Sequence, residues 1–321
     1  MIGNSRDGIG VATLCACALA VAACGGAEGE PNHDVDRPIA ISYPRFDGAS
    51  AYELVRRQVA FGPRIPGSEG HRAMAEWMEV FLAERADTLI VQRFTHVTVG
   101  GDTLPLVNLL ARFRPHESPS VLLLAHWDTR PKSDEAYDPE DREKPVPGAN
   151  DGASGTAILL ELASMMQGSP APRGVDLLLV DGEDYGDFAE GLDVFLGSRH
   201  FARNLPEDFD PEFGVLLDMV GDRDLDIYIE SYSNQYAPEV VDLVWNIAHG
   251  MGFSDVFHRR TRHAMRDDHI PLNEAGIPTI NIIDFDDYPY WHTPDDTPDK
   301  VSASSLGVVG AVMTRLIYRG R

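Results

Sequence analysis

Residues 120–128 read SVLLLAHWD, an apolar run that passes directly into His126, Trp127 and Asp128. A continuous apolar run of this length is typical of a strand that is buried on both faces of a parallel sheet. Residues 175–180 (VDLLLV) and 213–217 (FGVLL) have the same pattern. Residues 154–166, between the first run and the second, have the apolar spacing of a helix. This alternation predicts an α/β fold, a three-layer sandwich in which a mostly parallel, mixed central sheet has helices on both faces.

Segments on either side fit the same architecture. We expect further strands over residues 226–230 and 278–283, and further helices over 51–61, 71–85, 238–249 and 303–318. No internal repeat and no change of composition divides the chain beyond residue 37. Residues 38–321 are therefore predicted to form a single domain.

The first 37 residues have a different character. Residues 9–23 (IGVATLCACALAVAA) form an uncharged run that has the length of a signal-peptide core and is short for a membrane span. The run ends at Cys24 in a context that resembles a bacterial lipobox, although an ordinary signal cleaved nearby is an alternative. We expect residues 1–24 to be a lipoprotein-type signal with a lipidated Cys24, and residues 25–37 to be a flexible tether. The protein would then be exported and anchored to a membrane through its lipid, facing the periplasm or the cell exterior.

Charge and cysteine content exclude some classes of protein. The chain has 51 Asp and Glu against 27 Lys and Arg, a formal net charge of −24. A surface this acidic repels phosphate, which argues against a nucleic-acid binder or a binder of anionic membranes. All three cysteines (Cys15, Cys17 and Cys24) lie in the predicted signal. A metal in the predicted domain would therefore be bound by His, Asp or Glu.

Side chains of these types follow each predicted strand, where open α/β sheets place their functional residues. Each has an ordinary explanation when taken alone, such as a helix cap for Asp151 or a solvated edge for paired acids. Together they form a set with two histidines and several carboxylates that suits zinc. The set comprises His126, Asp151, Glu183, Asp184, Asp218 and His292.

In this order, the residues resemble the zinc aminopeptidase and glutaminyl cyclase superfamily, whose fold is an α/β sandwich. The likeness begins at residues 61–68 (FGPRIPGS) and covers most of the predicted domain. Residues 267–271 (DDHIP) and 291–293 (WHT) are similar to segments of the bacterial glutaminyl-peptide cyclotransferases. Asp184 departs from that pattern, since cyclases usually have Glu there, and residues 150–155 (NDGASG) are closer to the aminopeptidases.

The resemblance implies a role for each residue. Asp151, Asp184 and His292 would bind Zn²⁺, and Glu183 would be the general acid and base. Asp218 and Asp267 would join Glu183 in a hydrogen-bond network, while Trp291 and Asp268 would belong to the substrate pocket. One zinc ion is expected, and a second is possible if His126 and Asp218 also bind metal with Asp151 as the bridge.

Two enzymatic functions fit this set of residues. A glutaminyl-peptide cyclotransferase would convert the N-terminal Gln of a peptide or protein to pyroglutamate and release ammonia. An aminopeptidase with one or two zinc ions would instead hydrolyse the first peptide bond. A third hypothesis is a non-catalytic receptor domain, which would be expected to lack some of the ligands or the Glu, and this chain has them all.

Overall fold

Three buried strands, β3 (Ser120–His126), β4 (Val175–Val180) and β5 (Pro211–Asp218), pair in parallel at the centre of the sheet. Beyond β5, β8 (Thr279–Ile283) continues in parallel, while β1 (Thr88–Val97) and β2 (Thr103–Phe113) form an antiparallel pair next to β4. The computed structural model describes residues 43–117 and 119–319, and its six-stranded sheet has the order β1-β2-β4-β3-β5-β8. The predicted α/β sandwich with a mixed, mostly parallel sheet is confirmed.

Successive residues of β3 point into two different cores. Val121, Leu123 and Ala125 pack in the larger core, whereas Leu122 and Leu124 pack in a smaller one on the opposite face. Full burial of each such leucine stabilises the fold by about 2 kcal/mol. This explains why the strand is apolar at each position from 121 to 125, since neither face of the sheet is left to solvent.

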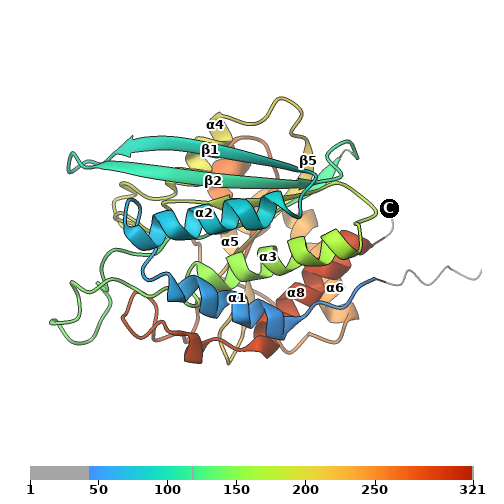
Figure 1. Ribbon diagram of the computed structural model, residues 1–321. Helices are drawn as coiled ribbons and strands as arrows, with labels where there is room; N and C mark the ends of the chain where they lie inside the picture. The colour runs from blue at the N-terminus through green and yellow to red at the C-terminus, as the bar shows by residue number, and fades with distance from the viewer. Residues whose placement is uncertain (1–42, 118, 320–321) are drawn as a thin grey trace, which may run out of the picture. The chain divides into compact units, whose positions relative to one another are not determined.

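Helices cover both of these faces (Figure 1). The larger core lies beneath five helices, and the smaller one beneath two short helices that contribute Phe201 and Leu272. The five are α1 (Gly48–Ala60), α2 (Glu69–Ala83), α3 (Ala153–Gly168), α6 (Pro238–Gly250) and α8 (Ala303–Tyr318), and the two are α4 (Leu196–Arg203) and α7 (His269–Glu274).

A smaller parallel sheet lies outside the main one and consists of β6 (Ile227–Glu230) and β7 (Phe257–Arg262). The strand predicted at residues 226–230 is therefore present but belongs to this second sheet. It is followed by α5 (Ser231–Tyr236). The backbone N–H groups of Tyr232 and Ser233, in the first turn of this helix, donate to the carboxylate of Glu230. A single 3₁₀ turn, Pro298–Lys300, precedes α8.

The sequence did not predict β1, β2, β7, or the short helices α4, α5 and α7. The predicted signal of residues 1–24, its Cys24 and the tether of residues 25–37 lie outside the described residues. Within the described part of the chain, no helix is long and apolar enough to cross a membrane.

The break between α1 and α2 contains a buried arginine, Arg64. Its guanidinium donates to the carbonyl oxygens of Trp127 (3.1 Å), Pro147 (2.6 Å) and Gly148 (2.6 Å). Residues 147 and 148 lead directly into the loop that precedes α3. Arg64 therefore joins the end of β3, which carries His126, to the loop before α3, which carries Asp151.

The packing of α3 on the sheet gives a test of the fold. An added Cβ at Gly155 would lie 2.1 Å from the carbonyl oxygen of Leu217 in β5, whereas at Gly168, in the same helix, it would meet nothing within 4 Å. We expect Gly155→Ala to lower the free energy of unfolding by about 3 kcal/mol. The matched variant Gly168→Ala should raise it by up to about 1 kcal/mol. Urea unfolding measures both, and equal stability of the two variants would contradict this packing.

Candidate active site

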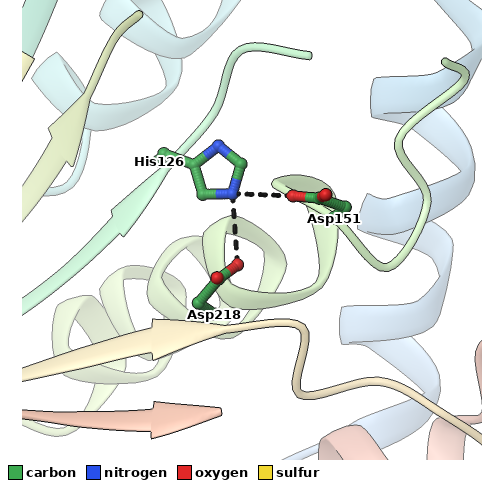
Figure 2. Close-up of side chains that lie close together, drawn as sticks. All are labelled: His126, Asp151 and Asp218. Atoms are coloured by element: carbon green, nitrogen blue, oxygen red, sulfur yellow. Dashed lines mark hydrogen bonds and ion pairs between the residues drawn. The ribbon is translucent and has the colours of Figure 1, made fainter. Parts of the chain in front are cut away.

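Parallel pairing of β3 and β5 places His126 beside Asp218, because each residue is the last of its strand. The Nε2 atom of His126 lies 3.2 Å from Oδ1 of Asp218 and 3.1 Å from Oδ1 of Asp151, which precedes α3 (Figure 2). All three side chains are buried, and their ligand-type atoms lie within 4.8 Å of one another. We call His126, Asp151 and Asp218 the first donor group.

Asp151 also belongs to a second donor group, with Asp184 and His292. Asp184 follows β4, and His292 lies on the segment between β8 and α8. The Nε2 atom of His292 is 3.1 Å from Oδ1 of Asp184 and 3.6 Å from Oδ2 of Asp151. The fold thus brings together the three residues that the sequence predicted as metal ligands, from positions 151, 184 and 292.

His292 is held in an unfavourable backbone conformation. Its φ is 52°, in the left-handed region, where a residue other than glycine has a conformational cost of about 1 kcal/mol or more. The N–H of Glu135 donates to its carbonyl oxygen (3.3 Å), and its ring stacks against Trp291, with centroids 3.8 Å apart. These contacts fix the direction in which the imidazole points.

Two aspartates, Asp128 and Asp296, hold the turns that carry the acidic residues. Asp128 accepts hydrogen bonds from the backbone N–H groups of Glu183 (3.1 Å) and Asp184 (3.2 Å). Asp296 accepts in the same way from Asn150 (2.8 Å) and Asp151 (3.1 Å). Neither aspartate has a role that the sequence predicted. Asp128 adjoins His126 in the chain, but nothing in the sequence connects Asp296 with Asn150.

Glu183 is buried between the two donor groups, and its Oε2 atom lies 4.0 Å from Nδ1 of His126. Burial, together with the nearby acids Asp267 and Asp184, raises the pKa of Glu183 well above the usual range of a carboxyl group, although the charge of His126 opposes the shift. A carboxyl group with a raised pKa can hold and release a proton near neutral pH. This behaviour is what the predicted general acid and base requires.

The two acids of the DDHIP segment face different ways. Asp267 lines the same hollow as Glu183, and accepts hydrogen bonds from Asn281 (2.6 Å) and from the N–H of Asp268. Asp268 is fully buried and accepts a hydrogen bond from Ser198 in α4. The prediction that Asp268 lines the substrate pocket differs from the structure, because its carboxylate is turned toward α4.

The predicted hydrogen-bond network among Glu183, Asp218 and Asp267 has a different form. In the described chain, Asp218 interacts with His126, and Asp267 with Asn281, while no hydrogen bond links the three carboxyl groups to one another. Burial and the charge of Asp218 raise the pKa of Asp267 to about 7. The three acids therefore influence one another through their charges.

The hollow beside the donor groups has a volume of about 280 Å³. It combines an acidic inner part with apolar and aromatic walls, and it includes the predicted pocket residue Trp291. Its lining also contains Asp151, Glu183, Phe188, Asp218, Met219, Ala264, Met265, Arg266, Asp267, Ile283, Phe285 and His292. A larger hollow of about 800 Å³, between residues 43–49 and α8, contains neither donor group.

The second donor group has the properties of a metal site. Oδ2 of Asp184 is buried and has no hydrogen-bond partner in the described structure, and burial raises the pKa of this carboxyl to about 7. Burial lowers the pKa of His292 to about 4, so its imidazole is neutral and can offer a lone pair. Two carboxylates and a neutral imidazole form a donor set that suits a divalent cation such as Zn²⁺.

An arginine on the loop of residues 129–148 contacts this group from outside. Arg130 donates to the backbone oxygen (3.2 Å) and Oδ1 (3.3 Å) of Asp184, and it forms a two-pronged ion pair with Asp134. Asp134 in turn lies 3.6 Å from Nδ1 of His292. Arg130 and Asp134 together contact two of the three candidate ligands.

A mixed sheet with two adjoining clusters of His and Asp at its strand ends defines a class of α/β enzymes that have a metal centre at this edge. The model of peptidase family M28 matches residues 108–317. The chain therefore belongs to peptidase family M28.

Similar proteins include both cyclases and peptidases. Tannerella forsythia glutaminyl cyclase is 37% identical, with a TM-score of 0.83, and the match covers 87% of this chain and 100% of that one. A Zn-dependent exopeptidase from Parabacteroides distasonis is 33% identical, with the same TM-score and the same coverage. Aminopeptidase YwaD of Bacillus subtilis is 25% identical over 84% of this chain, which spans only 57% of the length of that protein.

The contacts of Arg130 give a test of the second donor group. We expect Arg130→Met to weaken Zn²⁺ binding by about 10- to 100-fold, because Asp184 and Asp134 lose the cation that orients them. Competition with a chelator measures the affinity, and thermal unfolding of the metal-free protein checks that the fold is intact. Lys132→Met is the matched control, since Lys132 lies in the same loop, is exposed and pairs with Glu143. Equal Zn²⁺ affinity of the two variants would contradict the assigned role of Arg130.

Proposed function

We propose that this chain is a zinc-dependent glutaminyl-peptide cyclotransferase, which converts the N-terminal glutamine of peptides or proteins to pyroglutamate and releases ammonia. The observation that carries the proposal is the position of buried Glu183 at the inner end of a hollow of about 280 Å³, beside the second donor group. A hollow of this size with aromatic walls suits one side chain. The likeness to bacterial glutaminyl cyclases supports the same function.

Asp151, Asp184 and His292 would hold the zinc ion. The bound ion supplies positive charge that polarises the side-chain amide of the substrate and stabilises the negative charge that develops on its oxygen. The α-amine of the substrate is its own nucleophile, so the reaction gains from proximity. The amine nitrogen forms a bond to the amide carbon, the bond from that carbon to the amide nitrogen breaks, and ammonia leaves.

Glu183 manages the proton in this scheme. As a carboxylate it accepts a proton from the attacking amine, and it returns that proton to the departing nitrogen. Its raised pKa suits both steps. Trp291, Phe188 and Phe285 wall the hollow and limit the entry of water that would otherwise compete.

The first donor group favours a second candidate, a two-metal aminopeptidase in which Asp151 bridges the ions and Glu183 activates water. Likeness to the B. subtilis aminopeptidase also supports it. The state of His126 favours one ion instead. Although burial opposes it, interactions with Asp128, Asp151 and Asp218 raise the pKa of His126 well above its usual value. In these contacts Nε2 of His126 faces both aspartates, 3.1 Å from Asp151 and 3.2 Å from Asp218, and takes the place that a second ion would occupy.

The products of the reaction test the proposed function. Incubation of a zinc-loaded preparation with a Gln-Leu peptide should give a product that has lost one ammonia and is otherwise intact, as measured by mass spectrometry. Loss of the N-terminal residue would identify an aminopeptidase. We expect Glu183→Gln to lower kcat by at least about 100-fold without changing zinc content. Glu190→Gln, an exposed acid on the same loop, is the control and should remain active.

A second prediction concerns the metal count. Elemental analysis should find one zinc per chain, and His292→Ala should release it, because a ligand is lost. His126→Gln should keep one zinc per chain, since in this scheme His126 contacts Asp151 and Asp218 and is not a metal ligand. Two zinc ions per chain in the unaltered protein, falling to one in His126→Gln, would support the aminopeptidase and contradict a single-metal centre.

A further inference from the structure

Three arginines lie near one another, and one of them, Arg266, lines the hollow. Arg266 lines the hollow itself, and Arg199 and Arg203 lie on α4 close enough to affect each other's charge. None of the three guanidinium groups forms an ion pair or a side-chain hydrogen bond with the described residues. In a chain with 51 acids and 27 bases, unpaired arginines that lie side by side are an unexpected arrangement.

The guanidinium of Arg266 lies beside a glycine, Gly191, of the loop on the opposite side of the mouth. An added Cβ at Gly191 would lie 3.3 Å from Nη1 of Arg266. The loop that contains Gly191 also carries Phe188, a wall of the hollow. Arg266 therefore reaches from the segment before α7 to this loop, beside the route by which a peptide would enter.

The hollow carries negative charge in its inner part and positive charge at its mouth. Glu183, Asp218 and Asp267 form the acidic inner part, which attracts the N-terminal amine of a peptide. Arg266 at the mouth is exposed and carries the opposite charge. The acids nearest to Arg199, Glu274 and Asp268, do not form ion pairs with it in the described structure. A ligand that is positive at its first residue and negative just beyond it would be complementary to the acids of the inner part and to Arg266 at the mouth.

We propose that Arg266, supported by Arg199, binds a carboxylate that follows the N-terminal residue of the peptide substrate. This carboxylate would be the side chain of an acidic second residue or the free carboxyl terminus of a dipeptide. The inference rests on the proposed function, since it assumes that the terminal residue occupies the inner part of the hollow. An arginine can form two parallel hydrogen bonds with a carboxylate, which gives it both charge and shape preference.

The test compares peptides that differ only in this charge. Gln-Glu-amide is paired with Gln-Gln-amide, and Gln-Leu with a free carboxyl terminus is paired with Gln-Leu-amide. The first pair reports on an acidic second residue, and the second pair on a terminal carboxylate. We expect the charged member of at least one pair to have a KM about fivefold lower at low salt with little change in kcat. The preference should shrink as ionic strength rises.

Two variants test whether Arg266 causes this preference for the charged peptide. Arg266→Glu should abolish or reverse it, whereas Arg260→Glu should leave it intact. Arg260 is an exposed residue of β7 that does not line the hollow, and its replacement changes the net charge by the same amount. Because Arg266 has no ion pair or side-chain hydrogen bond among the described residues, Arg266→Glu should leave the thermal midpoint unchanged, whereas Arg260→Glu removes a contact with the ring of Tyr228 (5.6 Å). Equal effects of the two substitutions, or equal KM values within both peptide pairs, would overturn the proposal.

The products separate this proposal from the proposed function. Release of the N-terminal residue in place of ammonia would refute the cyclase, yet the same peptide pairs would still measure the charge preference. Ammonia release without a charge preference would support the cyclase and refute the subsite. Calorimetric titration of Gln-Glu-amide and Gln-Gln-amide onto Glu183→Gln makes the same comparison without turnover, and equal affinities there would refute the subsite.

Discussion

The burial of many carboxyl groups at one edge of the sheet is the constraint on which the rest of this site depends. The acids are Asp128, Asp151, Glu183, Asp184, Asp218, Asp267, Asp268 and Asp296, and all are buried. Each would be costly to bury as an unpaired charge. The structure offsets this cost with backbone N–H donors, with His126 and Arg130, and with raised pKa values that favour the protonated form of several acids. A bound cation would add to these contributions.

The acids divide into two kinds according to what they contact. Asp128 and Asp296 face backbone N–H groups and hold the turns before Asp184 and after Asn150, so they shape the site. Asp151 and Asp184 present oxygen atoms toward His292. The loop of residues 129–148 approaches the same histidine from another direction, through Glu135 and Asp134. The site is thus built from segments that are far apart in the chain and meet only in the folded domain.

The sequence predicted the elements whose burial leaves a strong pattern. β3, β4 and β5 are mainly apolar because both of their faces are covered, and the last residues of β3 and β5 supply His126 and Asp218. β1 was not predicted because it is an edge strand with polar residues and only partial burial. α7 is a single short turn of helix with too few residues to show a period.

The same distinction holds for the site. Acids at strand ends could be found because the ends of parallel strands meet at one edge. Arg130, Asp134 and Asp296 act through contacts across many residues, and no local pattern indicates such contacts. Asp268 was expected in the pocket from the resemblance to the cyclases, but neighbouring side chains at the start of a helix point in different directions, and its carboxylate contacts Ser198.

Asp296 has a further consequence for the way the protein matures. Its carboxylate accepts hydrogen bonds from the backbone of residues 150 and 151 and from the hydroxyl of Tyr288. His292 lies in the chain between Tyr288 and Asp296. The loop that carries Asp151, near the middle of the chain, therefore takes its final form only after the last quarter of the chain has been synthesised and has docked. Contacts between residues so distant in sequence form slowly during folding. The ability to bind metal would then appear late in folding. It would distinguish complete chains from truncated ones, because a chain that ends before this segment could not bind metal.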